Sequence, residues 1–317
     1  MDRVRVVQAI AGESFRAWLI RCIVFPLIGF KRAMRGPERF MREIARQQKH
    51  RDTGVDPSLR RRYAVKTEKV GGFTVHTVSP KAGAPRGVML YLHGSAYVAN
   101  MSPFHWLLVK GLITRTGARI VVPLYPLAPE HDWRAGYAMM DALYAQLLQE
   151  FAPEEITICG DSAGGGLSLG FAQALRDSGR PLPGRLILFS PWLNLSLENP
   201  RQEALEEKDA MLARPGLNWG ATCWAGGAPV EDPHISPIFG SLNGLPPMLV
   251  FTGGLDLLYA DAQELLEKAR AEDVALEFVE APRMTHAWSS LPVPEAHTLY
   301  DMAAAFVRNG TVGNPAS

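Results

Sequence analysis

Short apolar runs alternate with amphipathic stretches along most of this chain. Segments such as Val88–Leu92 and Leu186–Phe189 are apolar at every position, which is typical of strands buried on both faces of a parallel sheet. The stretches between these runs have helical spacing instead. Near the C-terminus, for example, Leu299, Met302 and Phe306 fall on one helical face. This alternation predicts a mainly parallel sheet covered by helices on both faces.

Eight strands and five helices can be delimited from this pattern. The turn Gly71-Gly72 between the first two strands predicts a hairpin, so the sheet is expected to begin antiparallel. The strands are expected at Tyr63–Val70, Phe73–Val78, Gly87–Leu92, Arg119–Leu124, Glu155–Cys159, Arg185–Phe189, Met248–Phe251 and Ala275–Glu280. The helices are expected at Pro103–Thr116, Ala135–Phe151, Ala163–Asp177, Tyr259–Glu272 and Pro294–Arg308.

Two segments interrupt the alternation. Residues 1–62 look helical, with an apolar stripe that ends where Pro26 breaks the run. Residues 195–240, between the sixth and seventh strands, contain no strand pattern. We predict that both segments form a cap over the sheet. The core is then made of residues 63–194 and 241–317.

Composition narrows the class of protein. The 317 residues suffice for one large domain or two small ones, and 47% hydrophobic with 21% charged residues is a globular composition. A net charge of +1 provides no field to hold nucleic acid, so no nucleic-acid partner is expected. Three scattered cysteines favour a reducing compartment. The apolar run at residues 17–30 is shorter than the roughly 20 residues that span a bilayer, and no signal-peptide pattern is found. We expect a soluble, cytoplasmic protein, and the sequence does not indicate its oligomeric state.

Charge is distributed unevenly along the chain. Residues 1–62 carry 15 Lys and Arg against 6 Asp and Glu, whereas the remainder carries 18 against 26. The basic segment has two interpretations. It could lie on an anionic membrane surface, at the inner face of the cell membrane, or it could be a cap helix whose Phe15, Trp18 and Leu19 line the mouth of a substrate site. The sequence favours the cap.

A G-x-S-x-G pattern lies between a predicted buried strand and a predicted helix. It consists of Gly160-Asp161-Ser162-Ala163-Gly164. A serine in this position occupies a sharp strand-to-helix turn, here called the elbow, that exposes its oxygen at the carboxyl edge of the sheet. The glycines leave room for the crowded backbone. A loop that cradles phosphate is the alternative, but the chain contains no G-x-x-x-x-G-K-[ST]. We predict that Ser162 is a nucleophile.

A serine nucleophile needs a base that is oriented by a carboxylate. Asp256 follows the seventh predicted strand and His286 the eighth, in the chain order typical of this elbow. Both positions lie at carboxyl ends of strands, where open α/β sheets build their sites. Helix capping is the alternative for Asp256. Asp261 competes for the acid role but is expected within the following helix. No metal-ligand pattern is present, and neither a metal nor a cofactor is expected.

The third predicted strand ends in a loop with glycine next to a histidine, His93-Gly94-Ser95-Ala96. Acyl transfer needs preorganised amide donors where negative charge develops on the substrate. We expect the amides of Gly94 and Ser95, with that of Ala163 at a helix N-terminus, to form this oxyanion hole. His93 is expected to brace the loop.

Together these blocks resemble the hormone-sensitive-lipase-like branch of the α/β-hydrolases, the bacterial esterase and lipase group, from about Gly87 to Trp288. Further matching blocks are Tyr125–His131, Ser190–Leu193, Ser236-Pro237 and Leu245–Pro247. The resemblance implies an α/β-hydrolase fold with an eight-stranded, mostly parallel sheet, helices on both faces and a helical cap. It also implies hydrolysis of short- to medium-chain carboxylic esters without a cofactor.

Three positions depart from the pattern of that branch. Ser95-Ala96 replaces two glycines of its H-G-G-G loop, Pro126 replaces an arginine, and Arg283 replaces a glycine before the histidine. An amidase, a formamidase or an acyltransferase on the same triad remains an alternative, as does a ligand-binding relative without catalysis.

The expected partner is a small-molecule ester. We expect it to contact Tyr97 in the loop after the third strand and three tryptophans of the cap, Trp18, Trp219 and Trp224.

Overall fold

One sheet runs through the protein, with its strands in the order β1-β9-β8-β7-β6-β4-β5-β3-β2. The computed structural model describes residues 3–8, 10–49 and 54–312, and within them nine strands are found. The strands are β1 (Val4–Val7), β2 (Ala64–Val70), β3 (Phe73–Ser79), β4 (Val88–Leu92), β5 (Arg119–Pro123), β6 (Ile156–Asp161), β7 (Arg185–Phe189), β8 (Met248–Gly253) and β9 (Leu276–Ala281).

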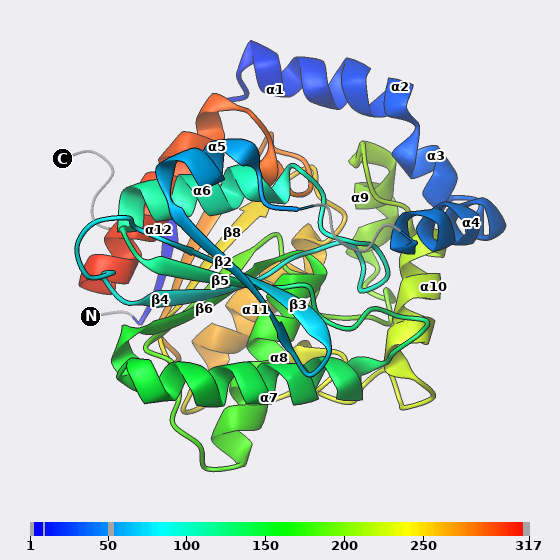
Figure 1. The fold of residues 1–317 in the computed structure, drawn as a ribbon. Coiled ribbons are helices and arrows are strands. Elements are labelled where there is room, and N and C mark those ends of the chain that lie inside the picture. The colour runs from blue at the N-terminus through cyan, green and yellow to red at the C-terminus, as the bar shows by residue number, and fades with distance from the viewer. Residues whose placement is uncertain (1–2, 9, 50–53, 313–317) are drawn as a thin grey trace.

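Helices connect and flank these strands (Figure 1). The α-helices are α1 (Phe15–Leu19), α2 (Phe25–Ile28), α3 (Phe30–Met34), α4 (Pro37–Gln48), α5 (Pro57–Arg62), α6 (His105–Thr116), α7 (Trp133–Glu150), α8 (Ala163–Asp177), α9 (Arg201–Lys208), α10 (Arg214–Ala225), α11 (Tyr259–Ala271) and α12 (Pro294–Asn309). A π-helical turn, η1 (Ile20–Val24), joins α1 to α2, and short 3-10 turns are η2 (Pro153–Glu155), η3 (Pro237–Phe239) and η4 (Trp288–Ser290).

All eight predicted strands are confirmed, as are the antiparallel start and the parallel remainder of the sheet. β2 pairs antiparallel with β3, and β3 antiparallel with β5. Every other neighbouring pair is parallel.

The ninth strand corrects the sequence analysis, because Val4–Val7 was expected to be helical with the rest of residues 1–62. These residues instead pair parallel with β9, from Val4 opposite Leu276 to Val7 opposite Val279. Three valines in four positions suit a strand, and the outer edge of β9 offers unpaired backbone groups for them to bind.

Two apolar cores lie on opposite faces of the sheet. Successive residues of a strand point to opposite faces, so Met89 of β4 packs with α6 and α12, whereas Leu90 packs with α7, α8 and α11. Figure 1 shows these helices as separate layers above and below the strands. The sheet is therefore covered on both faces, and its carboxyl edge is left for the site.

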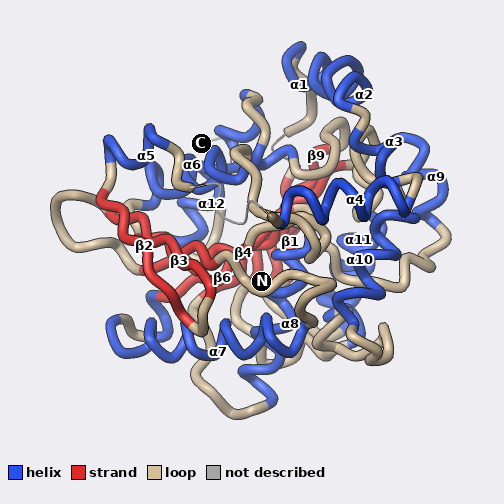
Figure 2. The backbone as a smooth tube through the Cα atoms, turned by 45° about the vertical axis from the view of Figure 1, so that its right-hand side comes forward, coloured by secondary structure: helices blue, strands red, loops and turns tan. Residues whose placement is uncertain are grey.

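The N-terminal helices and the insertion after β7 lie together at that edge. α3 and α4 pack against α10, and Figure 2 shows them side by side. Among the residues that the structure describes, no helix is both long and apolar enough to cross a membrane.

Candidate active site

Ser162 occupies a tight turn between β6 and α8. Its backbone has φ 52° and ψ −121°, a conformation rare for a residue with a side chain. The turn depends on the neighbouring glycines. A Cβ at Gly160 would lie 2.3 Å from the carbonyl oxygen of Gly164, and a Cβ at Gly164 would lie 2.0 Å from that of Leu92. The chain therefore places the serine hydroxyl beyond the end of β6, as the G-x-S-x-G pattern predicts.

His286 links Ser162 to Asp256 by two hydrogen bonds. The Ser162 hydroxyl lies 3.0 Å from His286 Nε2, and His286 Nδ1 lies 2.9 Å from Asp256 Oδ2. In this arrangement the Ser162 hydroxyl donates to Nε2 of His286, and Nδ1–H of His286 donates to the carboxylate of Asp256. All three side chains are buried, with Ser162 5% exposed, His286 3% and Asp256 0%. Three residues far apart in the chain thus meet at one edge of the sheet.

Two glycines allow the loops that carry Asp256 and His286 to touch. A Cβ at Gly253 would lie 2.4 Å from the carbonyl oxygen of Met284, and a Cβ at Gly254 would lie 2.4 Å from that of Pro282. The two loops are joined by a hydrogen bond from the amide of Leu255 to the carbonyl of Met284 at 3.0 Å. The separation of Asp256 and His286 is consequently fixed by backbone contacts.

Burial and charge act in opposite directions on His286. Burial alone would lower the pKa of the imidazole, because it disfavours the charged form. The charge and the hydrogen bond of Asp256 outweigh burial, so the pKa of His286 lies above its ordinary value of 6.5. The surroundings of His286 thus favour its imidazolium form, the species that an imidazole becomes when it accepts a proton.

The loop after β4 supplies amide donors beside Ser162, one residue later than the sequence analysis expected. The amide of Gly94 donates to Asp161 Oδ1 at 3.1 Å and is therefore occupied. The amides of Ser95, Ala96 and Ala163 have no acceptor among the described residues. Ser95 and Ala96 have φ values of 97° and 53°, and both line the same pocket as Ser162. The free amides are those of Ser95, Ala96 and Ala163.

Asp161 holds this loop against the elbow. Its buried carboxylate accepts the Tyr91 hydroxyl as well as the amide of Gly94, and His105 Nε2 lies 3.4 Å away. Burial would raise the pKa of Asp161, but His105 and these hydrogen bonds outweigh it and hold the pKa below its ordinary value. The residue before the serine therefore remains an anion that orders the amide loop.

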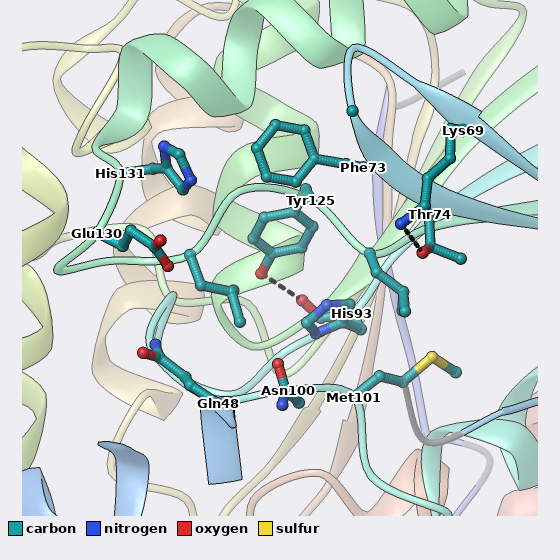
Figure 3. A pocket seen from close by; sticks show the side chains of 13 residues that line it. Gln48, Lys69, Phe73, Thr74, His93, Asn100, Met101, Tyr125, Glu130 and His131 are labelled. Atoms are coloured by element: carbon teal, nitrogen blue, oxygen red, sulfur yellow. Dashed lines mark hydrogen bonds between the residues drawn. The ribbon is translucent and has the colours of Figure 1, made fainter. Parts of the chain in front are cut away.

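A small cavity of about 110 Å³, lined by polar and apolar side chains, lies behind the same loop (Figure 3). Tyr125 donates its hydroxyl proton to the carbonyl of His93 at 2.7 Å, and its ring stacks on the imidazole. His93 Nδ1 lies 2.6 Å from the carbonyl oxygen of Gly94. Burial lowers the pKa of His93 to about 4. His93 thus braces the loop as a neutral ring.

Comparison with known proteins identifies the family. The profile of the α/β-hydrolase fold matches residues 89–290. The chain belongs to the α/β-hydrolase family. This hydrolase is 34% identical over 245 residues to an acetyl-hydrolase of Streptomyces hygroscopicus, a match that covers 76% of this chain and 82% of that protein. It is also 34% identical over 220 residues to a triacylglycerol lipase of Mycobacterium tuberculosis, a match that covers 68% of this chain and 45% of that protein.

A solved structure places the hydrolase within the family. An esterase from the bacterial hormone-sensitive lipase family superposes on it with a TM-score of 0.75 and 26% identity, over 91% of this chain and 97% of that one. The hydrolase is a member of the hormone-sensitive-lipase-like branch. It is an enzyme of the esterase and lipase class.

A largely apolar pocket of about 280 Å³ opens over Ser162 of the hydrolase. Its walls come from the N-terminal helices, the loop after β4, the insertion and the loop that carries His286. The N-terminal helices contribute the apolar side chains Phe25, Ile28, Phe30, Met34 and Phe40, and the insertion contributes Met211, Leu212 and Leu217. The N-terminal segment and the insertion thus both contribute side chains to this pocket.

The four predicted substrate contacts of the hydrolase lie outside these walls. Trp224 is fully buried and stacks on Tyr97 at 4.3 Å between ring centroids. Trp219 packs behind Phe40, at 5.8 Å between centroids. Trp18 is 42% exposed. The stacked pair fills the core beneath the loop because large aromatic rings gain most when fully buried.

Asp209, which no sequence motif indicated, lies in the insertion of the hydrolase beside the loop of Asp256. This buried carboxylate accepts the amides of Met211 and Leu212 through Oδ1 and that of Leu257 through Oδ2, all within 2.8 Å. Burial and the charge of Asp256 raise the pKa of Asp209 to about 6. The chain offers no motif for it, because a lone aspartate in an insertion has no distinctive spacing.

Asp261, the competing acid, has a different place in the hydrolase. It lies in α11, as expected, and accepts the amides of Leu193 and Asn194 at 3.2 and 3.1 Å and the side chain of Gln202 at 2.9 Å. Burial raises its pKa to about 8. Asp261 therefore ties the start of the insertion to the core.

Proposed function

We propose that the protein is a serine hydrolase that cleaves short- to medium-chain carboxylic esters through Ser162, His286 and Asp256. The observation that carries the proposal is the buried hydrogen-bonded chain from Asp256 through His286 to the Ser162 hydroxyl, at 2.9 and 3.0 Å. The names of the relatives, acetyl-hydrolase and triacylglycerol lipase, support ester substrates.

The geometry supports a two-step acyl transfer. Ser162 Oγ attacks the ester carbonyl while its proton moves to His286 Nε2, and Asp256 holds the imidazole in the required tautomer. The amides of Ser95, Ala96 and Ala163 stabilise the oxyanion. The tetrahedral intermediate then collapses to an acyl-serine, and the leaving alkoxide takes the proton from Nε2.

Water completes the cycle by the same route in reverse. His286 accepts a proton from the water as its oxygen attacks the acyl-serine carbonyl, and a second oxyanion forms at the same amides. Collapse returns the proton to Ser162 Oγ and releases the carboxylic acid. No step requires a cofactor.

The pocket supports a modest acyl group. Its volume of about 280 Å³ lies just below the roughly 300–1,000 Å³ of sites that enclose drug-sized ligands. Its lining is apolar apart from the residues around Ser162, which suits an alkyl chain. We also propose that the cap is formed by the helices that lie between residues 1 and 62 and by the insertion at 195–240, over the core of residues 63–194 and 241–317.

The test is the Ser162→Ala variant assayed against p-nitrophenyl acetate, butyrate, octanoate and laurate, with the matching anilides as amide substrates. We expect the wild type to prefer the shorter esters and the variant to lose at least a thousandfold in kcat. A variant that kept wild-type turnover would refute the triad. Faster cleavage of anilides than of esters would favour an amidase instead.

A further inference from the structure

The helical rod formed by α1, η1 and α2 presents an apolar face to solvent. Within the rod, all of which the structure describes, only Ala17 is buried. Phe15 is 76% exposed and Leu27 81%. The remaining exposed apolar side chains of the rod are Trp18, Leu19, Ile23, Val24 and Ile28. Single exposed apolar residues need no explanation, but a continuous row marks an interaction surface.

This arrangement differs from the cap that the sequence favoured. Phe15, Trp18 and Leu19 were expected to line the substrate mouth, yet they lie outside the pocket walls and face solvent. Phe25 and Ile28, at the other end of the rod, are the residues that line the pocket. The rod therefore continues outward from the mouth of the Ser162 pocket.

Specific contacts hold the rod at both ends. The amide and hydroxyl of Ser14, at its start, donate to the carboxylate of Glu295 at 2.5 and 3.1 Å. Just beyond its end, the Lys31 ammonium donates to the carbonyls of Glu206 and Asp209. Figure 1 shows α1 and α2 along the outer edge of the molecule. The apolar face is consequently displayed on an anchored element rather than on a loose end.

Exposed cations lie on the rod and on the two helices that follow it. The exposed ones between residues 10 and 49 are Arg16, Arg32, Arg35, Arg39, Arg42, Arg46 and Lys49, whereas Glu38 is the exposed acid of the same stretch. Arg39, Arg42 and Arg46 line a groove along α4 that shares Ile28 and Phe30 with the Ser162 pocket. A positively charged rim thus adjoins both the apolar rod and the mouth of the pocket.

We propose that this surface binds an anionic phospholipid bilayer, with the rod in the interfacial layer and the cations on lipid phosphates. A helix with Trp, Phe and Leu on one face and Arg and Lys beside it has the composition of an interfacial helix. Anionic head groups attract such cations. A second copy of this chain fits less well, because a symmetric contact would bring each basic rim against its own copy.

Docking in this orientation turns the mouth of the pocket toward the membrane. Phe25 and Ile28 belong to both the rod and the pocket wall, so an ester dissolved in the bilayer would reach Ser162 without crossing bulk water. This consequence rests on the proposed function, whereas binding to the bilayer does not.

Co-sedimentation of the full chain with vesicles tests the proposal, using Ser162→Ala to prevent hydrolysis. We expect strong binding to vesicles of phosphatidylglycerol and phosphatidylcholine, at least tenfold weaker binding to phosphatidylcholine alone, and partial release by salt, which screens the charges. Phe15→Ser with Leu27→Ser should reduce binding at least tenfold. Phe239→Ser, a change at an exposed aromatic residue (44%) on η3, away from the rod, should leave it unchanged.

Three outcomes would overturn the proposal. These are the absence of binding to anionic vesicles, equal binding by the Phe15→Ser, Leu27→Ser variant, and a solution dimer that this variant converts to monomer. The last outcome would assign the face to a second copy. Because sedimentation needs no turnover, its failure is distinguishable from the failure of the esterase assignment, which the soluble p-nitrophenyl esters report.

Discussion

The carboxylate of Asp209 accepts the backbone N–H of Leu257 at 2.8 Å, and Leu257 directly follows Asp256. A residue of the insertion therefore fixes the loop that carries the proposed catalytic acid. The backbone of the same aspartate receives the ammonium of Lys31 from α3. Both parts of the proposed cap are thus connected to the loop of Asp256 through one buried residue.

Asp209→Asn should reduce kcat by roughly tenfold to a hundredfold with little change in KM. An amide has one acceptor oxygen where the carboxylate has two, so the contact to either Leu257 or the pair Met211 and Leu212 is lost, and small displacements of catalytic groups are costly. Steady-state kinetics with p-nitrophenyl butyrate measures this effect. Asp177→Asn, an exposed position on α8, is the matched control. Wild-type kinetics in the Asp209 variant would contradict a positioning role.

The pH dependence of kcat/KM should have an acid limb centred above pH 6.5. Protonated His286 cannot accept the serine proton, so activity falls as the pH drops through the pKa of His286, which lies above 6.5. His93 cannot produce this limb, because its pKa is about 4. A pH–rate profile with a neutral ester gives the midpoint.

The same profile distinguishes two effects of Asp209. Its negative charge contributes to the raised pKa of His286, so Asp209→Asn should move the acid limb to lower pH. A purely structural role would lower the rate without moving the limb.

Gly94→Ala should reduce kcat by a factor of about 10² to 10³, the cost of losing an oxyanion donor. A Cβ at this position would lie 2.6 Å from Asp161 Oδ2 and 3.0 Å from the Ser162 Cβ, so the loop that carries Ser95 and Ala96 must shift. Gly12→Ala is the control, because a Cβ there meets nothing within 4 Å. If both variants retained full activity, the loop would have no part in transition-state stabilisation.

Trp224→Ala should destabilise the protein by about 3–5 kcal/mol, whereas Trp18→Ala should change stability by less than about 0.5 kcal/mol. Trp224 is fully buried and stacked on Tyr97, while Trp18 lies on the exposed rod. Urea denaturation of the two variants measures both values. A similar loss in the two would argue that the rod packs against the body more closely than its exposure indicates.

Sequence alone predicted the elements whose burial is uniform. Buried parallel strands such as β7 are apolar at nearly every position, so their limits are visible, and the chain order of Ser162, Asp256 and His286 followed from the elbow. β1 escaped detection because it is four residues long and includes Arg5. Its state is decided by the free edge of β9, which no local pattern reveals.

The direction in which a side chain or an amide points was the other property that the sequence did not reveal. Trp224 looked like a substrate contact, yet its ring packs inward because Gly136 of α7 leaves room for it: a Cβ there would lie 2.6 Å from the Trp224 ring. The amide of Gly94 was expected in the oxyanion hole, but it donates its hydrogen bond to the carboxylate of Asp161. Both outcomes depend on a partner that is distant in the chain.

The pairing of β1 with β9 has a practical consequence for work with this protein. Removing the first dozen residues, so that the chain begins close to α1, would remove β1. The outer edge of β9 would then carry unpaired backbone amides and carbonyls. An unpaired strand edge of this kind pairs with strands of other molecules. Because β9 runs directly into the segment that bears His286, shortened forms are expected to precipitate and to lose turnover together.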